Sequence, residues 1–121
     1  MTVIRYPSTK PLPLSSATQA GGFLFLSGVL PLDEQGKPFK GDIQAETRAV
    51  LREIDALLLE RGASRKDVVR AMVWLADLND FAGFNDEYGR FFEGHLPARS
   101  AVQATLNRGA RVEIEVQAWL G

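Results

Sequence analysis

The sequence predicts one α+β domain over residues 1–121, with the element order ββαβαββ and both helices packed on one face of the sheet. Three observations support this prediction. A length of 121 residues suits a single domain. Two segments carry apolar residues at helical spacing, and the segments around them show the short apolar or alternating pattern of β-strands. The chain has no self-similarity at the period of a solenoid repeat.

The N-terminal third is expected to be mostly extended. Proline, serine and threonine recur in residues 1–20, which predicts an irregular arm or an edge strand. The aromatic and aliphatic run from Phe23 to Gly28 predicts a buried strand that ends at the glycine. Residues 31–42 contain two prolines and two glycines, so they are expected to form a polar hairpin or loop.

Two amphipathic helices follow from the spacing of apolar residues. The first has Asp42 as its N-cap and Gly62 as its stop. Its apolar stripe consists of Ile43, Thr47, Val50, Leu51, Ile54, Leu57 and Leu58. The second begins at Asn79 or Asp80 and stops at Gly94. Its aromatic residues are expected to belong to the core: Phe81, Phe84, Tyr88, Phe91 and Phe92.

Three further strands complete the sheet. Residues 67–77 are apolar at both odd and even positions, which is typical of a central strand, and residues 100–106 and 111–120 form two strands separated by an NRGA turn. In the last strand one side is apolar and is expected to lie under the helices, whereas the other carries Glu113 and Glu115. Helices on one side only leave the second face open, so we expect an oligomer to bury it.

The composition excludes several classes of site. Lys and Arg number 14 against 15 Asp and Glu, and no basic segment stands out, so nucleic-acid binding is not expected. No apolar run is long enough to span a membrane, and the N-terminal residues lack the apolar core of a secretion signal, so a cytoplasmic location is expected. Cysteine is absent and His95 is the single histidine, which argues against a metal site or a nucleophilic triad.

Several motifs together resemble the RidA/YjgF family of reactive-intermediate deaminases. They are FLFLSG, DLNDFAGFNDEYGRFF, and PARSAV followed by RVEIEVQA, and the similarity extends from about residue 20 to residue 118. The resemblance implies a fold like that of the trimeric chorismate mutases, assembled as a homotrimer with a central barrel and clefts between subunits. It also implies hydrolysis of 2-imino and enamino acids to 2-keto acids and ammonia, with no metal or organic cofactor.

The resemblance also assigns site residues by position. Arg99 of PARS matches the arginine that binds the substrate carboxylate, and Glu113 of VEIEV matches the acid that positions water. Gly28 and Asn85 match residues that line the cleft. Two positions depart from the family pattern: Leu14 replaces a tyrosine and Ala101 replaces a cysteine.

These departures leave three functional hypotheses. The first is a deaminase that acts on a bulkier or more apolar imine. The side chain of Leu14 cannot donate a hydrogen bond to the substrate, but the backbone N–H of Ala101 still can. The alternative is a noncatalytic module that binds a small carboxylate or docks on a partner enzyme. RNA cleavage ranks last, because neither the charge balance nor one loop histidine supports it. Asn85 and Gly28 also have plain structural explanations, as a helix-surface residue and a strand terminator.

Overall fold

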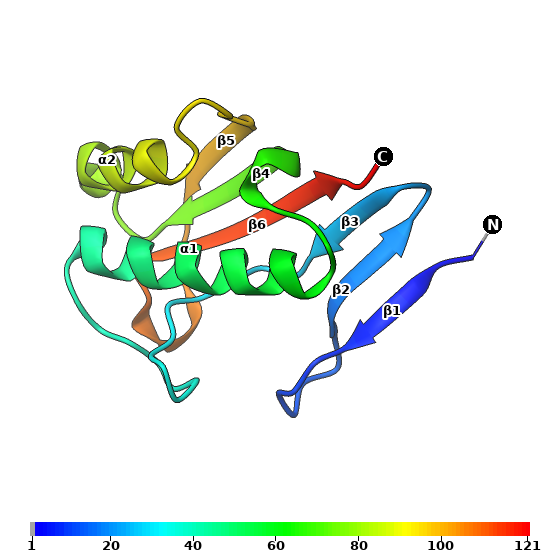
Figure 1. Ribbon diagram of the computed structural model, residues 1–121. Coiled ribbons are helices and arrows are strands. Elements are labelled where there is room, and N and C mark those ends of the chain that lie inside the picture. Colours follow the sequence, from blue (N-terminus) through cyan, green and yellow to red (C-terminus); the bar gives the residue numbers. More distant parts are fainter. Residues whose placement is uncertain (1) are drawn as a thin grey trace.

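The computed structural model describes residues 2–121 as two helices packed on one face of a six-stranded mixed sheet (Figure 1). The strands, in chain order, are β1 (Ile4–Pro7), β2 (Ser15–Ala20), β3 (Phe23–Leu26), β4 (Val68–Leu75), β5 (Ala98–Gln103) and β6 (Val112–Trp119). The helices are α1 (Ile43–Glu60) and α2 (Phe81–Phe91). Short 3₁₀ turns lie at Arg65–Asp67, Leu78–Asp80 and Asn107–Gly109. Thus the α+β class and the single helical layer are confirmed.

The strand count before the first helix was wrong by one. The sequence predicts a single arm or edge strand in residues 1–20, whereas β1 and β2 pair as two antiparallel strands. Ile4 faces Gln19, and the register shifts between Tyr6 and Pro7. Proline does not prevent this pairing, because Pro7 lies at the end of β1 and the other two prolines lie in the connecting loop.

The two C-terminal strands do not form a hairpin. The sheet order is β1-β2-β3-β6-β4-β5, so β4 lies between β5 and β6. β5 pairs in parallel with β4, and β6 pairs antiparallel with both β3 and β4. A βα-crossover through α2 delivers β5 to the sheet edge, which is why the NRGA segment joins strands that are not neighbours. Residues 107–109 form a 3₁₀ turn in which Arg108 has a positive φ of 61°.

Helix α1 begins and ends as its sequence predicts. The Asp42 side chain accepts a hydrogen bond from the Ala45 N–H at 2.8 Å, which caps the first turn. At the other end Gly62 adopts a φ of +75°, a conformation that glycine reaches without strain. The buried stripe of α1 packs over β6 and α2, and the core is completed by alternate residues of the central strands.

A buried carboxylate fixes the start of β6. Glu46 of α1 is 1% exposed, and its two oxygens accept the backbone N–H groups of Gly41 at 3.2 Å and Arg111 at 2.9 Å. The Arg111 Nε lies 3.6 Å from the same carboxylate and donates to the Gly41 carbonyl oxygen. Glu46 therefore joins the loop before α1 to the strand that carries Glu113.

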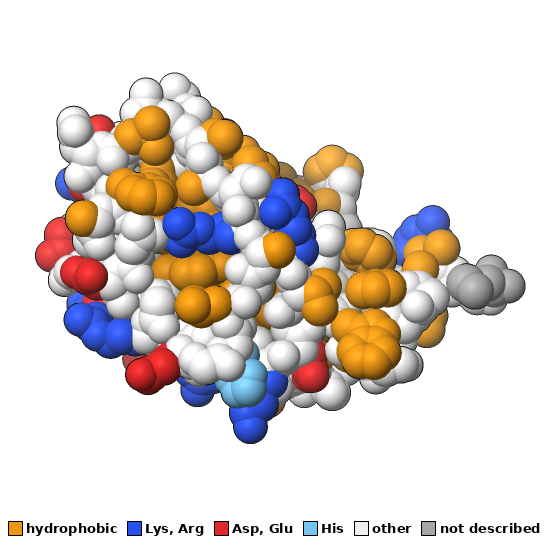
Figure 2. Space-filling model, turned by 90° about the horizontal axis from the view of Figure 1, so that it is seen from above, with side chains coloured by type: hydrophobic (Ala, Val, Ile, Leu, Met, Phe, Trp, Pro, Cys, Tyr) orange, Lys and Arg blue, Asp and Glu red, His pale blue; other side chains and the backbone are white. Residues whose placement is uncertain are grey.

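The face of the sheet opposite the helices stays uncovered by any segment of residues 2–121. Val112, Ile114, Val116 and Ala118 of β6 are buried beneath the helices, as predicted. The opposite face exposes large apolar side chains, namely Phe23 (39%), Phe25 (38%), Val102 (43%) and Trp119 (55%). In Figure 2 the surface seen from above also carries several groups of apolar side chains, with basic side chains among them. Exposed apolar surface of this kind marks a contact site.

No helix within residues 2–121 has both the length and the apolarity that crossing a membrane requires.

Candidate active site

Arg99 lies on the helix side of the sheet. It stands on β5 in register with Ala71 of β4, whose side chain is fully buried under the helices. Because partners in a sheet direct their side chains to the same face, Arg99 also points toward α2. There its Nη1 donates a hydrogen bond to the Asn85 Oδ1 at 2.9 Å. Arg99 and Asn85, which the resemblance assigned separately to carboxylate binding and to the cleft lining, are therefore in direct contact.

Three aromatic rings of α2 surround the guanidinium of Arg99. Its Cζ lies 4.8 Å from the ring centroid of Tyr88, 5.4 Å from that of Phe84 and 5.6 Å from that of Phe81. Ring faces attract a cation and restrict its motion, so the guanidinium is held in place. No Asp or Glu of residues 2–121 forms an ion pair with Arg99. A held, partly buried arginine without an acidic partner is suited to bind an anionic ligand.

These aromatic residues were expected only as core. Phe84 and Tyr88 are indeed buried, but Phe81 is 42% exposed, so its assignment to the core was wrong. Their spacing at positions 81, 84 and 88 on one helix face was the available signal, because it brings all three rings to one spot. Burial raises the pKa of Tyr88 to about 12, although the Arg99 charge acts in the opposite direction. Tyr88 therefore stays neutral, and within the described chain its buried hydroxyl has no hydrogen-bond partner.

Ala101 lies two residues beyond Arg99 and on the same face. It is in register with the buried Val73, and its side chain packs against the core. Arg99, Asn85 and Ala101 thus form one group, which we call the arginine half-site. It lies where the edge strand β5 meets α2.

Glu113 lies on the opposite face of the sheet. It stands on β6 in register with Trp74 of β4, and both side chains point away from the helices. Burial raises the pKa of Glu113, and the neighbouring Glu115 carboxylate raises it further. A glutamate with a raised pKa keeps a larger protonated fraction near neutral pH, which suits it to receive and return a proton.

Gly28 provides the space that the Glu113 carboxylate occupies. A Cβ atom at position 28 would lie 2.2 Å from the Glu113 Oε2, far closer than any real contact. Adjacent backbone bonds hold the segment in place, because Val29 and Ile114 exchange N–H···O bonds of 2.8 and 3.2 Å. Gly28 is therefore more than a strand terminator: only glycine allows the carboxylate to lie against the backbone here.

A cavity of about 890 Å³ lies next to this carboxylate, and its lining includes Leu14, Gly28 and Glu113. These three residues form the second group, which we call the glutamate half-site. Leu14 is 45% exposed and carries no hydrogen-bonding group on its side chain. The same cavity is lined by residues that the sequence did not suggest, such as Ser27, Arg61 and Arg108. Arg108 belongs to the predicted NRGA turn, but the sequence does not show that this turn lies beside the cavity, because that position depends on the tertiary fold.

The six predicted residues thus divide into two half-sites that do not meet within one chain. Arg99, Asn85 and Ala101 belong to the helix side of β5, whereas Glu113 belongs to the other face of β6. The strand β4 lies between β5 and β6. Within residues 2–121 no group of three His, Cys, Asp or Glu side chains is placed to hold a metal ion.

The chain is similar to known proteins in sequence and in fold. A family model described as Endoribonuclease L-PSP matches residues 8–120. A RutC family protein of Pyrococcus abyssi is 43% identical over 113 residues, covering 91% of this chain and 89% of the relative. The chain belongs to the RidA/YjgF family.

Two further RidA/YjgF relatives have more specific names. The 2-iminobutanoate/2-iminopropanoate deaminase of Mus musculus is 40% identical over 111 residues, covering 90% of this chain and 82% of the mouse protein. The crystal structure of E. coli TdcF with bound serine superposes with a TM-score of 0.87 at 32% identity, covering 97% of this chain and 94% of that one. The names of these RidA/YjgF relatives differ: one gives only the family, one names a deaminase, and one names a bound ligand.

Proposed function

We propose that the protein hydrolyses 2-imino and enamino acids to 2-keto acids and ammonia, without a cofactor, in a cleft between two subunits of a homotrimer. The observation that carries this proposal is the division into half-sites. The Arg99 guanidinium is positioned to bind a carboxylate on the helix side of the sheet. Glu113, whose pKa is raised, stands on the opposite face of β6 and lines a separate cavity. The deaminase name of the mouse relative supports the same reaction.

Assembly brings the two half-sites together. The uncovered face carries Phe23, Phe25, Val102 and Trp119, which a partner subunit would remove from water. Burial of this face in a ring of subunits is a heterologous contact, in which one surface of each chain meets a different surface of the next. In such a ring the arginine half-site of one chain faces the glutamate half-site of its neighbour. One active site then forms at each subunit boundary.

The reaction follows from the groups available. The Arg99 guanidinium binds the substrate carboxylate, and its Nε and second Nη remain for that purpose because Nη1 is bonded to Asn85. Glu113 accepts a proton from water as the water oxygen bonds to the imine carbon and the π pair moves to nitrogen. Glu113 then returns the proton to nitrogen. Glu113 next moves the hydroxyl proton of this carbinolamine to the same nitrogen, so the C–N bond breaks with ammonia as the leaving group and the 2-keto acid remains.

Replacement of Arg99 tests the proposal. The substrate is 2-iminopropionate generated in solution, and the readout is its hydrolysis in competition with semicarbazide. Two charge-assisted hydrogen bonds contribute roughly 1.5–3 kcal/mol each, so Arg99→Ala is expected to lower kcat/KM by about 10²-fold or more. Arg5→Ala is the matched control, because Arg5 is exposed on β1 at the far edge of the sheet. An Arg99→Ala protein as active as Arg5→Ala would refute the assignment.

A noncatalytic carboxylate-binding protein is the second candidate. Leu14 and Ala101 carry neither a hydroxyl nor a thiol, so the site has fewer side chains able to move protons. The bound serine named for E. coli TdcF is a small carboxylate, which supports binding as a function in itself. Calorimetry with a 2-keto acid separates the two candidates. Binding that disappears in Arg99→Ala, with no turnover of any imino acid tested, would favour this second function.

A further inference from the structure

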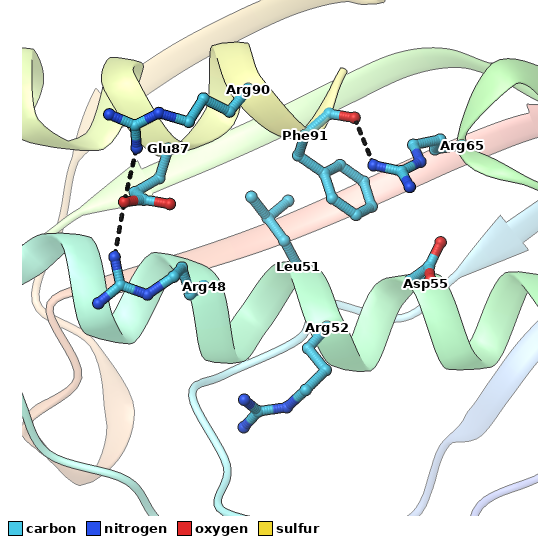
Figure 3. Close-up of a pocket in the computed structure, with 8 residues that line it drawn as sticks. All are labelled: Arg48, Leu51, Arg52, Asp55, Arg65, Glu87, Arg90 and Phe91. Atoms are coloured by element: carbon cyan, nitrogen blue, oxygen red, sulfur yellow. Dashed lines mark hydrogen bonds and ion pairs between the residues drawn. The ribbon is translucent and has the colours of Figure 1, made fainter. Parts of the chain in front are cut away.

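A separate groove runs between α1 and α2 on the outer side of the helix layer (Figure 3). Its volume is about 450 Å³, within the usual range for small-molecule sites. The groove shares no lining residue with either half-site, and the sheet lies behind the helices in this view. It therefore lies on the side of the helix layer away from the uncovered face of the sheet.

One end of the groove has two arginines that share a buried carboxylate. Glu87 of α2 is 7% exposed, and its Oε1 accepts hydrogen bonds from the Arg48 Nη1 at 2.6 Å and the Arg90 Nη1 at 2.9 Å. One negative charge thus holds two guanidinium groups side by side. Within residues 2–121 neither arginine has another hydrogen bond, so the Nε and second Nη of each remain available. Their side chains are 57% and 68% exposed, which leaves these donors accessible.

The other end has a third fixed arginine over an apolar floor. The Arg65 Nη1 donates to the Phe91 carbonyl oxygen at 3.0 Å, and its Cζ lies 4.9 Å from the Phe91 ring centroid. Figure 3 shows Leu51 and Phe91 between this arginine and the Arg48–Glu87–Arg90 cluster. An apolar body lying on Leu51 and Phe91 would therefore have guanidinium groups at both of its ends.

The charge in the groove is opposite to that of the whole chain. Four arginines and two carboxylates line it, a surplus of two positive charges, whereas the chain has a formal charge of −1. A phosphomonoester carries about −1.5 to −2 at neutral pH and three acceptor oxygens, which matches this surplus and the free arginine donors. We propose that the groove binds a small phosphomonoester with an aromatic or aliphatic body.

The proposal is tested by calorimetric titration of the full-length protein with phenyl phosphate at pH 7.5 and about 0.1 M ionic strength, where long-range attraction is screened. Saturable binding with a Kd below about 1 mM is expected. Arg48→Gln and Arg65→Gln should each weaken it by about tenfold, since each removes charge-assisted bonds. Arg5→Gln changes the net charge equally but lies outside the groove, so it should leave Kd unchanged.

Two further measurements separate a built site from general attraction. Phe91→Leu should weaken phenyl phosphate more than inorganic phosphate, because only the former has a body that lies on the ring. Lowering the pH from 7.5 to 5 should weaken phenyl phosphate several-fold, as the ligand loses its second charge near pH 6. The absence of saturable binding up to about 10 mM would overturn the proposal. An affinity loss in Arg5→Gln equal to that in a folded groove variant would also overturn it, and either groove variant suffices for this comparison if the other fails to fold.

Discussion

The division of the site between two sheet faces makes a strong prediction about mixed oligomers. Arg99→Ala removes the arginine half-site and Glu113→Gln impairs the glutamate half-site, so each variant alone should be inactive. When the two variants assemble together, some boundaries will join an intact Arg99 from one chain with an intact Glu113 from its neighbour. Activity should therefore return on mixing, although no chain in the sample is wild type.

The expected recovery follows from random assembly. A boundary is active only if its arginine comes from a Glu113→Gln chain and its glutamate comes from an Arg99→Ala chain. At equal amounts each condition holds for half of the chains, so about a quarter of the boundaries are intact in a ring of heterologous contacts. The recovered activity should be about a quarter of the wild-type value, and it should decline on either side of the equal ratio.

The assay is imine hydrolysis by variants that are co-expressed with different affinity tags. Purification through both tags selects mixed trimers, in which one boundary in three is intact, so the selected fraction should recover about a third of the wild-type activity. Native mass spectrometry shows which mixed oligomers are present. The control is a mixture of Arg99→Ala with Arg99→Ala,Glu113→Gln, which can form no intact boundary. Confirmed mixed oligomers that are no more active than this control would refute the assignment of the two residues to different chains.

Three other predictions concern single residues. Gly28→Ala should lower kcat by about 10²- to 10⁴-fold with an unchanged circular dichroism spectrum, because its Cβ would displace the Glu113 carboxylate without straining the backbone. Glu113→Gln should raise the thermal midpoint at pH 7.5 and lose this advantage below about pH 4, because a raised pKa means that the folded state favours the protonated acid; an equal or lower midpoint at pH 7.5 would contradict the sign. Glu46→Ala should lower the free energy of unfolding by about 2–4 kcal/mol in urea titrations, since the N–H groups of Gly41 and Arg111 lose their acceptor; a loss below about 0.5 kcal/mol would show that water replaces it.

Local patterns predicted most of the secondary structure because the controlling interactions are local. The stripe of α1, its Asp42 cap and its Gly62 stop all lie within one segment, and the structure confirms each of them. The pairing of β1 with β2 was not predicted, since hydrogen bonds between separate segments leave little trace in a proline-containing sequence. The placement of β4 between β5 and β6 was likewise missed, because strand order depends on the crossover through α2.

The same distinction between local and nonlocal interactions applies to the candidate site. Alternation along β6 already separated Glu113 from the buried Val112 and Ile114. The strand predicted at residues 100–106, however, began too late to include Arg99, which lies within β5. The motifs PARS and VEIEV also identified the residue types that suit carboxylate binding and proton transfer. The pattern of β5 also does not show which of its faces lies under the helices, because polar residues occur at both its odd and its even positions.

The sequence by itself therefore determined most of the elements, the helical layer and the chemical character of the site residues. Only the tertiary structure decided that Arg99 lies against the rings of α2, on the face of the sheet opposite to Glu113, and that Gly28 leaves space for the Glu113 carboxylate. The physical reason is register: alternation sets which residues of a strand share a face, but pairing with a distant strand sets which face it is. In this protein that pairing separates the two halves of the candidate site within one chain.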